Sequence, residues 1–481
     1  MSGPFPVENA TVPYWRTQLH HLDSHRSTPE LPEKQDIVII GAGFAGAAIA
    51  HYLLKDHPDN KPRPSITILE AREACSGASG RNGGHIRPDL FVGLAACMQA
   101  HGLEAANQAA LFEEANARAL EALVREDNID CDLRAVTTGD VFVDAAEAAK
   151  IRKLWDAMAK LDCPTLGRVA AHLDPREAER ASGVRGARVA FTYPAHVVWP
   201  YKLVMHLLEE AVVAKDGAVN LQTRTMVHGV SEALDGDGYW TVATARGPTR
   251  ARTVVFATNA YTAGLLPEYD EAIYAARGAV CRVVVARDGV AAATDNSSSS
   301  SSSSNNIPLG SAGLEMESPN TVDSYYGLRA DGSILVGGGK SVFIDEREEW
   351  YRNYDDSTLI EATVPYFDGW AARTFTGWEG RAETESIWTG IMGYSADDAP
   401  HVGHVPSKPG QYICAGFNGH GMPNVLLCAK GVAEMIRDGR AFSETGVPAL
   451  YETSAERLRR ISDLVAAPTA GRARADIYLK F

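Results

Sequence analysis

Three glycines near the N-terminus have the spacing of a turn that binds a dinucleotide. An apolar stretch from Asp36 leads into Gly41-Ala-Gly43-Phe-Ala-Gly46, and a helix of small residues is expected to follow. Gly41 would permit a tight turn, Gly43 would let backbone N–H groups approach a pyrophosphate, and Gly46 would let the helix pack closely on the strand. The N-terminus of that helix would favour the negative charge of the phosphates.

An acidic residue completes this motif. A second short apolar strand, residues 66–69, ends on Glu70. A carboxylate in this place accepts hydrogen bonds from ribose hydroxyls. Strand, glycines, helix, strand and acid in this order predict a dinucleotide site; a glycine-rich turn that binds nothing is the alternative.

The composition is typical of an enzyme and not of a protein that binds nucleic acid. The chain has 481 residues, 45% hydrophobic and 22% charged, and its 46 basic and 61 acidic residues give a net charge of −15. A chain of this length divides into two or three domains. Because nucleic acid needs a basic surface, we expect no such partner. No apolar run approaches the roughly 18 residues of a membrane span, so no membrane contact is expected.

The cysteines give no sign of a metal site. Seven are scattered along the chain without a Cys-x-x-Cys pair. This pattern argues against a disulfide framework and against zinc, so no metal is expected. The N-terminus lacks the basic start and apolar run of a secretory signal. The sequence therefore predicts a cytoplasmic protein.

The remaining pattern predicts helices and strands around one low-complexity insertion. Helices are expected at 105–125, 145–161, 204–215 and 424–437, and strands at 218–223, 239–243, 253–257 and 333–339. Residues 290–308 contain an unbroken serine run and are expected to form a disordered loop. Residues 412–421 again lead from a strand into glycines before a helix, which predicts a second helix N-terminus facing a ligand.

Five segments together resemble the FAD-dependent amine and amino-acid oxidases typified by D-amino-acid oxidase, glycine oxidase and sarcosine oxidase. The γ-glutamylputrescine oxidase-like branch looks most similar, and the resemblance spans residues 15–436. The segments are the glycine motif extended to Ala50, residues 75–85, residues 255–261 followed by Leu265-Leu-Pro267, residues 388–403, and residues 416–422.

This resemblance implies an α/β fold with two interleaved domains. A Rossmann-like FAD-binding domain of the glutathione reductase type would comprise residues 34–95, 165–270 and 385–440. An α+β substrate domain on a mixed or antiparallel sheet would comprise residues 96–164 and 271–384. Residues 1–33 would form an arm over the surface, and residues 441–481 a C-terminal tail. The site would lie between the domains, at the carboxyl ends of the parallel strands.

The same resemblance implies which residues hold FAD. The turn at 79–81 would offer N–H groups and a cation to the phosphates, and the backbone of Val227 would touch adenine. The loop around His420 would aim a helix N-terminus at the pyrimidine edge of the flavin. The expected cofactor residues are Gly41, Gly43, Phe44, Ala45, Gly46, Glu70, Ala71, Arg72, Ser79, Gly80, Arg81, Asn82, Gly83, Val227, Thr258, Asn259, Gly419, His420, Gly421 and Met422.

Two departures from the sarcosine oxidase pattern bear on cofactor and substrate. Those enzymes attach flavin through a cysteine that would fall near Ile391 or Met392, where this chain has none, so FAD is expected to be noncovalent. A linkage through His85 is the alternative. A lysine that binds the substrate carboxylate in those enzymes is replaced here by Met422 and Pro423, which argues against N-methylglycine as the substrate.

The implied reaction is hydride transfer from the carbon beside an amine nitrogen to the flavin, followed by imine hydrolysis and reoxidation by oxygen to hydrogen peroxide. Because the cofactor performs the difficult step, residues that line the site matter more than a nucleophile. The expected catalytic residues are Tyr325, Trp388, Met392, His85 and Arg87. Additional lining candidates are Tyr326 and Tyr394, and the alternative for the aromatic residues is a place in the core. Arg87, Arg277 and Arg329 are candidates for binding a substrate carboxylate, with a loop ion pair as the alternative for Arg87.

The predicted function is an FAD-dependent oxidase of a primary or secondary amine or amino acid, with a small-molecule substrate and oxygen as partners. Two alternatives stay open: a flavin dehydrogenase that uses another acceptor, and an FAD monooxygenase. A monooxygenase needs NAD(P)H, and the sequence has no second Gly-x-Gly-x-x-Gly motif. Neither the particular amine nor the oligomeric state follows from the sequence.

Overall fold

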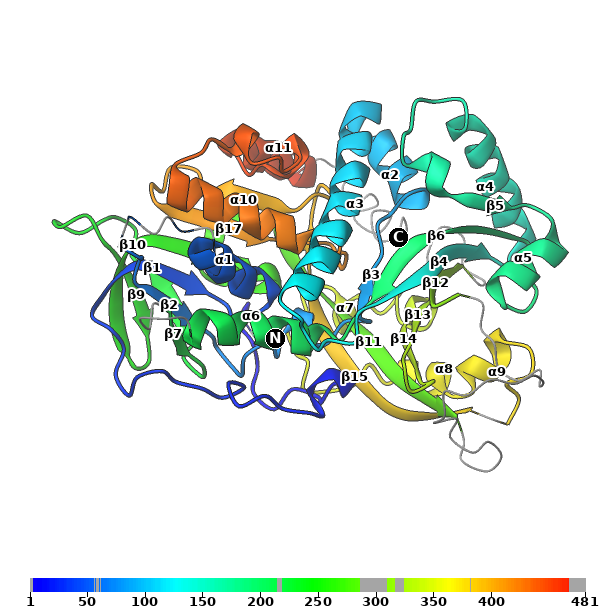
Figure 1. Ribbon diagram of the computed structural model, residues 1–481, viewed down its shortest axis with the longest axis horizontal. Helices are drawn as coiled ribbons and strands as arrows, with labels where there is room; N and C mark the ends of the chain where they lie inside the picture. The colour runs from blue at the N-terminus through cyan, green and yellow to red at the C-terminus, as the bar shows by residue number, and fades with distance from the viewer. Residues whose placement is uncertain are drawn as a thin grey trace.

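The computed structural model describes residues 3–466, except for residues 56, 58–59, 61, 214–218, 286–308, 316–323 and 381. Its strands form two large sheets that lie side by side, with helices packed against them (Figure 1). This is the mixed α/β architecture that the sequence predicts. The serine-rich segment expected to be disordered lies outside the described residues.

The helices fall into long packing helices and short connecting turns. Their bounds are α1 Phe44–Lys55, α2 Val92–His101, α3 Leu103–Glu126, α4 Ala145–Met158, α5 Pro175–Ser182, α6 Pro200–Val213, α7 Arg347–Trp350, α8 Thr363–Phe367, α9 Trp370–Thr374, α10 Val425–Asp438 and α11 Ala455–Ala466. Within the described ranges, no helix has the length and apolarity needed to cross a membrane. The four helices expected from the sequence are confirmed within a few residues at each end.

The first sheet has a parallel centre. In spatial order it contains β16 His401–His404, β17 Gln411–Ala415, β10 Gly247–Phe256, β1 Lys34–Ile40, β2 Ile66–Leu69 and β7 Val219–Gln222, while β8 Val227–Val230 and β9 Trp240–Thr244 extend it from β10. The pairs β17–β10–β1–β2–β7 are parallel. The last four residues of β1 are all buried, as expected for a strand covered on both faces.

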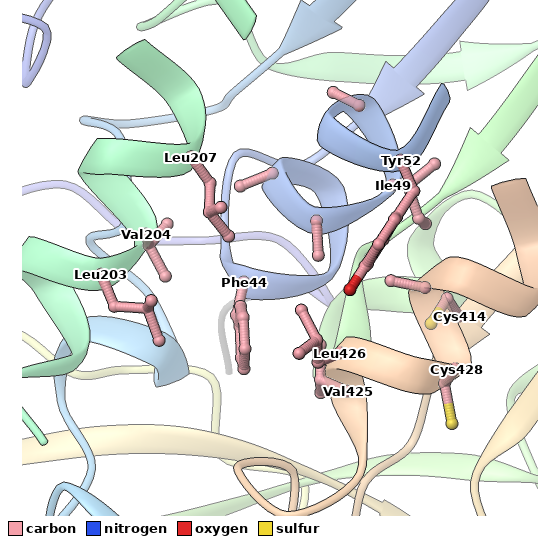
Figure 2. Packing of buried hydrophobic residues seen from close by; sticks show 14 of the residues in the cluster. Phe44, Ile49, Tyr52, Leu203, Val204, Leu207, Cys414, Val425, Leu426 and Cys428 are labelled. Carbon is pink, nitrogen blue, oxygen red and sulfur yellow. The ribbon is translucent and has the colours of Figure 1, made fainter. Parts of the chain in front are cut away.

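Helix α1 lies between two other helices on this sheet (Figure 2). Phe44 and Ile49 of α1 pack with Leu203 and Leu207 of α6 on one side and with Leu426 of α10 on the other, and all five side chains are buried in one cluster. Burial of such side chains contributes about 1.5–3 kcal/mol each. This packing holds the N-terminal end of α1 in place. That end of the helix faces the predicted dinucleotide.

The second sheet is mostly antiparallel. In spatial order it contains β15 Ala382–Ser395, β11 Ile273–Val285, β14 Ile334–Gly338, β13 Ser324–Leu328, β12 Ser311–Glu315, β4 Arg134–Phe142, β6 Val189–Val197 and β3 His85–Ile86, with β5 Ala170–His172 beside β6. Only the β12–β4 pair is parallel among its described pairings. The long strands β11 and β15 reach from this sheet toward the first one (Figure 1).

Two segments differ from the predicted organisation. Strand β6 pairs with β4 in the second sheet along its whole length, although residues 165–270 were assigned to the FAD domain. The N-terminal arm is anchored instead of superficial, because Trp15 is fully buried and donates from Nε1 to the carbonyl of Asn82 at 2.5 Å. The arm thereby supports the loop that was expected to pass the cofactor.

Candidate active site

One cavity of about 560 Å³ joins the two sheets. Its walls come from the glycine turn after β1, the loop at 77–83, the loop at 417–425, strand β15 and helices α2 and α3. These segments are far apart in the sequence, and the fold places them around one space. The cavity is therefore the candidate site for both a dinucleotide and its substrate.

The start of α1 forms the phosphate end of this cavity. Gly43, Phe44 and Ala45 line it, and the first N–H groups of a helix have no partner within the helix. The Phe44 N–H donates to the Ser79 hydroxyl at 2.9 Å, so the loop at 77–83 closes over the turn. The remaining donors and the helix dipole suit a pyrophosphate.

The glycines of this turn are required by close backbone approaches. A Cβ on Gly46 would lie 1.9 Å from the carbonyl oxygen of Gly41, and one on Gly41, whose φ is +109°, would lie 2.6 Å from the carbonyl oxygen of Ala257. A Cβ on Gly43 would meet the Ser79 hydroxyl at 3.2 Å. Gly46 does not line the cavity; it allows the packing of helix on strand that the sequence predicts.

Glu70 is held at the end of β2 by two backbone groups. Its Oε2 accepts a hydrogen bond from the Ala42 N–H at 2.8 Å, and its Oε1 accepts one from the Arg72 N–H at 2.9 Å. Each carboxylate oxygen keeps acceptor capacity for a further donor. The arrangement suits a ribose, and it fixes the acid relative to the glycine turn.

Asn259 ties the second glycine loop to the end of β10. Its backbone is left-handed, with φ of 41°, and its Oδ1 accepts hydrogen bonds from the N–H groups of Gly416 at 3.0 Å and Phe417 at 3.4 Å. The loop that carries Gly419, His420 and Gly421 is thereby tied to the end of β10. Two glycine turns from opposite ends of the chain meet at one cavity.

Arg72 and Arg81 are committed to the protein itself. Both Nη atoms of Arg72 donate to the fully buried carboxylate of Asp356, at 2.8 and 3.1 Å. Arg81 donates to the carbonyls of Ser76, Thr11 and Thr389 and lies 3.4 Å from the same carboxylate. The sequence interpretation placed the Arg81 cation on the phosphates. In the structure Arg81 orders the loop instead, because its nitrogens already have acceptors within the chain.

All predicted cofactor residues other than Gly46 and Gly80 line the cavity. Gly80 is needed for packing, since a Cβ there would lie 2.0 Å from the carbonyl oxygen of Cys75. Val227 and Thr258 line the cavity as well, at the end near Glu70 and at the end of β10. Their contacts with a cofactor remain predictions.

The second sheet supplies an aromatic wall. Tyr325, Met392 and Tyr394 line the cavity together with His85, and the His85 ring stands edge-on to Tyr325 at 5.5 Å. Burial, followed by the charges of Arg87 and Arg329, lowers the pKa of His85 to about 3, so its ring is neutral at physiological pH. Burial also raises the pKa of the Tyr325 hydroxyl, which therefore stays a hydrogen-bond donor.

Trp388 and Tyr326, which were expected at the site, do not line the cavity. Trp388 is fully buried and donates from Nε1 to the carbonyl of Arg81 at 2.9 Å. Tyr326 is buried in the core of the second sheet, because side chains alternate along β13 and its neighbour Tyr325 takes the cavity face. Both residues therefore lie in the core, which is the alternative that the sequence left open.

The predicted arginine candidates are paired within the chain. Arg87 lines the cavity, but its Nη2 donates to Asp140 and to the hydroxyl of Tyr193. Arg277 donates to Glu349 and to Thr358, and Arg329 donates to the carbonyl of Val198 and to the Asp132 carboxylate. None of the three offers an uncompensated cation for a substrate carboxylate.

A carboxylate that the sequence did not single out holds His420. Glu113 of α3 accepts from His420 Nε2 at 3.0 Å and from the Asp89 N–H at 2.7 Å with Oε2, and from Asn424 at 3.0 Å with Oε1. Burial opposes the charged imidazole, but Glu113 outweighs it and the pKa of His420 rises above its ordinary value. Glu113 therefore favours the protonated form of His420, which lines the cavity next to the second glycine loop.

Replacement of Glu113 by Gln tests this pairing. A raised folded-state pKa contributes stability that is fully present below the unfolded pKa of about 6.5 and is lost as pH rises through the folded value. We expect E113Q to lower the free energy of unfolding by about 1.5–3 kcal/mol at about pH 5.5 and by less at about pH 9. Chemical unfolding at both pH values measures it, with the exposed Glu126→Gln on the same helix as control. An equal loss at both pH values would contradict the pairing.

The comparison with known protein families identifies the chain. Residues 36–435 match the family model described as FAD dependent oxidoreductase (DAO). The chain belongs to this family of FAD-dependent oxidoreductases. The match covers most of the chain, including both glycine loops and the aromatic wall, so FAD is the dinucleotide for which the cavity is shaped. The fold and cofactor predictions are confirmed.

Individual relatives are similar at low identity. The chain is 22% identical over 404 residues to gamma-glutamylputrescine oxidoreductase from Escherichia coli K12, covering 84% of this chain and 83% of the relative. Among solved structures, glycine oxidase from Geobacillus kaustophilus has a TM-score of 0.63 at 19% identity, with 85% of this chain and 96% of that chain covered. L-proline dehydrogenase from P. horikoshii has a TM-score of 0.60 at 20% identity, with coverages of 85% and 95%. These structures share the fold.

Proposed function

We propose that this protein is an oxidase that uses FAD to remove a hydride from the carbon beside an amine nitrogen. The observation that carries the proposal is the single cavity in which the cofactor end, with Glu70 and Gly43, is continuous with the aromatic wall of Tyr325 and Tyr394. The names of the similar proteins, an amine oxidoreductase and a glycine oxidase, support an amine substrate.

Bound FAD would supply a two-electron acceptor for the hydride of the C–H bond; the nitrogen lone pair would form C=N, and an N–H proton would leave to solvent. The chain's own residues orient the substrate and exclude water. Tyr325 and Tyr394 present aromatic faces, and aromatic faces favour amines. Because His85 is neutral, it adds no positive charge that would oppose binding of the amine. The product imine hydrolyses to a carbonyl compound.

The proposal includes oxygen as the acceptor, noncovalent FAD and a cytoplasmic location. Ile391 and Met392 stand where related enzymes carry an attaching cysteine, which supports noncovalent binding. All seven cysteines are free, which supports a reducing compartment. We further propose that the domain boundaries follow sheet membership, with 34–84, 198–272 and 396–440 in the FAD domain and 85–197 and 273–395 in the substrate domain.

A peroxide-coupled screen tests the function. The purified holoenzyme is offered primary amines, diamines, N-alkyl amino acids and D-amino acids in air, and peroxide and oxygen are followed together. The proposal requires peroxide formation with at least one amine. Reduction of an artificial dye without oxygen consumption would select the dehydrogenase alternative, and oxidation of NADPH would select the monooxygenase. Acid precipitation that leaves the yellow colour in solution confirms noncovalent FAD.

Tyr325→Phe tests the aromatic wall. Tyr325 lines the cavity and its hydroxyl is a neutral donor; loss of the hydroxyl should lower kcat/KM for the amine about 10–100-fold, which corresponds to about 1.4–2.8 kcal/mol. The affinity for FAD should not change. Tyr326→Phe is the matched control, because this neighbour lies in the core away from the cavity. Equal effects of the two substitutions on kcat/KM would remove Tyr325 from the site.

A further inference from the structure

The positive charges that line the cavity are all engaged by the chain. Arg72 and Arg81 share Asp356, Arg87 pairs with Asp140, and Arg277 pairs with Glu349. Lys340 also has a partner within the chain. Binding a substrate carboxylate to any of them would require a paired cation to give up its own partner.

The described histidines that line the cavity do not offer an uncompensated positive charge either. His85 is neutral, and His420 is paired with Glu113, which compensates its charge when the ring is protonated. His101 has its Nε2 at 3.2 Å from the carbonyl oxygen of Asp397. An α-amino acid would therefore bring its carboxylate into a cavity with no uncompensated cation among the described residues that line it. Such a charge binds poorly when it is removed from water without a partner.

Unlike these cations, one carboxylate that lines the cavity has no ion-pair partner in the described part of the chain. Asp89 lines the wall at the start of α2, and its Oδ1 accepts a hydrogen bond from the Gly93 N–H at 2.8 Å. In the described part of the chain it forms no ion pair, since the neighbouring guanidinium of Arg87 is taken by Asp140. Its Oδ2 lies directly over Gly93, where any side chain would collide with it: an added Cβ would be 2.1 Å away.

Two carboxylates, Glu113 and Asp140, surround Asp89 together with the groups that they pair with, His420 and Arg87. Glu113 accepts from the Asp89 N–H at 2.7 Å, and Asp140 is near enough to disfavour ionisation of Asp89. Burial and then Asp140 raise the pKa of the Asp89 carboxyl in the absence of a ligand. A cationic group placed beside Asp89 would relieve that repulsion. The net charge of −15 also favours the approach of a cation.

We propose that the substrate is an amine that carries a second cationic group and no α-carboxylate, and that Asp89 binds the second group. The inference rests on the proposed amine oxidation and deepens it. The reacting nitrogen lies at the cofactor and aromatic wall, while the second cation lies at the start of α2. Asp89 forms a charge-assisted hydrogen bond with the ammonium or guanidinium. This bond sets how long the substrate must be for its other nitrogen to reach the reacting position.

The first test compares substrates of matched length on the wild-type holoenzyme. 1,4-Diaminobutane, n-butylamine and 4-aminobutanoate share a four-carbon chain and differ in the group at the far end. Flavin reduction is measured without oxygen. We expect the second-order rate constant of flavin reduction by the diamine to exceed that for the monoamine at least tenfold and that for the amino acid by more. A monoamine or an amino acid that reduces the flavin as well as the diamine would overturn the inference while leaving amine oxidation intact. If no amine reduces the flavin, the proposed function itself fails.

The second test removes the charge. Asp89→Asn keeps an oxygen that can accept from the Gly93 N–H, and it should lower the ratio of kcat/KM for 1,4-diaminobutane to that for n-butylamine at least tenfold. Asp89→Glu should restore part of the preference, and the exposed Asp345→Asn serves as control. An unchanged ratio of diamine to monoamine in D89N would overturn the inference. Should D89N not fold, the substrate comparison on the wild type decides alone.

A binding measurement gives a readout that does not depend on turnover. 2,5-Dimethylhexane-2,5-diamine has no hydrogen on the carbons beside its nitrogens, so it cannot lose a hydride. Calorimetry should show that it binds the wild-type holoenzyme at least tenfold more tightly than 2-methylhexan-2-amine, and that D89N abolishes the difference. Equal affinities of the two compounds for the wild type would contradict a cation site at Asp89.

Discussion

Asp356→Asn should be the most damaging single substitution in this chain outside the glycine turn. The fully buried carboxylate compensates two buried guanidinium groups at once, those of Arg72 and Arg81. Removal of one partner from a buried ion pair typically costs about 3–5 kcal/mol, because the remaining charge has neither water nor a counter-charge. We expect the free energy of unfolding to fall by that amount. FAD should also be lost on gel filtration, since both arginines order the 72–81 segment.

Two measurements check this result, namely the denaturant midpoint of the holoenzyme and its FAD content after gel filtration. The exposed Asp368→Asn makes the same chemical change and should shift stability by less than about 0.5 kcal/mol. A D356N protein that keeps its FAD and unfolds at the wild-type midpoint would show that the Asp356 network does not hold the cofactor loop.

Gly46→Ala should abolish cofactor binding although Gly46 does not line the cavity. A methyl group there would overlap the carbonyl oxygen of Gly41, so α1 has to move away from β1. Overpacking of this kind costs about 1–3 kcal/mol. Movement of the helix start also displaces the donors at Gly43 and Phe44, and each tenfold loss of FAD affinity corresponds to about 1.4 kcal/mol. We expect a loss of at least about 100-fold.

Fluorescence titration of the apoprotein with FAD measures the affinity. Gly229→Ala is the matched control: Gly229 lies in β8 of the same sheet, and a Cβ there meets nothing within 4 Å. It should bind FAD like the wild type. If G46A titrates with the wild-type dissociation constant, close packing of α1 on β1 does not set the phosphate site.

The phosphate end of the site could be predicted from sequence because its parts are local. The glycine turn, the strand before it and Glu70 lie within a short stretch, and each residue type follows from a steric or hydrogen-bonding need. The loop around His420 was found for the same reason. Its glycines follow the buried strand β17 and precede α10.

The residues that position these parts could not be found in the same way. Asp356, Glu113 and Asp89 act on segments far away in the chain, and none stands in a spacing that signals its partner. A carboxylate on a helix looks solvated until the fold buries it against a cation. The pairing of Arg81 and Arg87 within the chain could not be predicted for the same reason. The sequence shows the cations, and only the structure shows their acceptors.

The assignment of β6 shows a second limit. A sequence pattern does not say which sheet a strand joins, because pairing is decided by long-range register. Trp388 illustrates the same point at the level of one side chain. It stands on the strand that also carries Met392, yet its side chain does not line the cavity and donates to the Arg81 carbonyl instead.

Anaerobic reduction of the bound flavin tests the proposed amine chemistry most directly, because it does not depend on the electron acceptor. Holoenzyme is mixed with 1,4-diaminobutane in the absence of oxygen, and the yellow absorbance is followed through a single turnover. We expect rapid bleaching, formation of one equivalent of carbonyl product, and return of the colour when air is admitted. A flavin that stays oxidised with this diamine and with every other amine and amino acid tested would contradict the proposal that this enzyme oxidises amines.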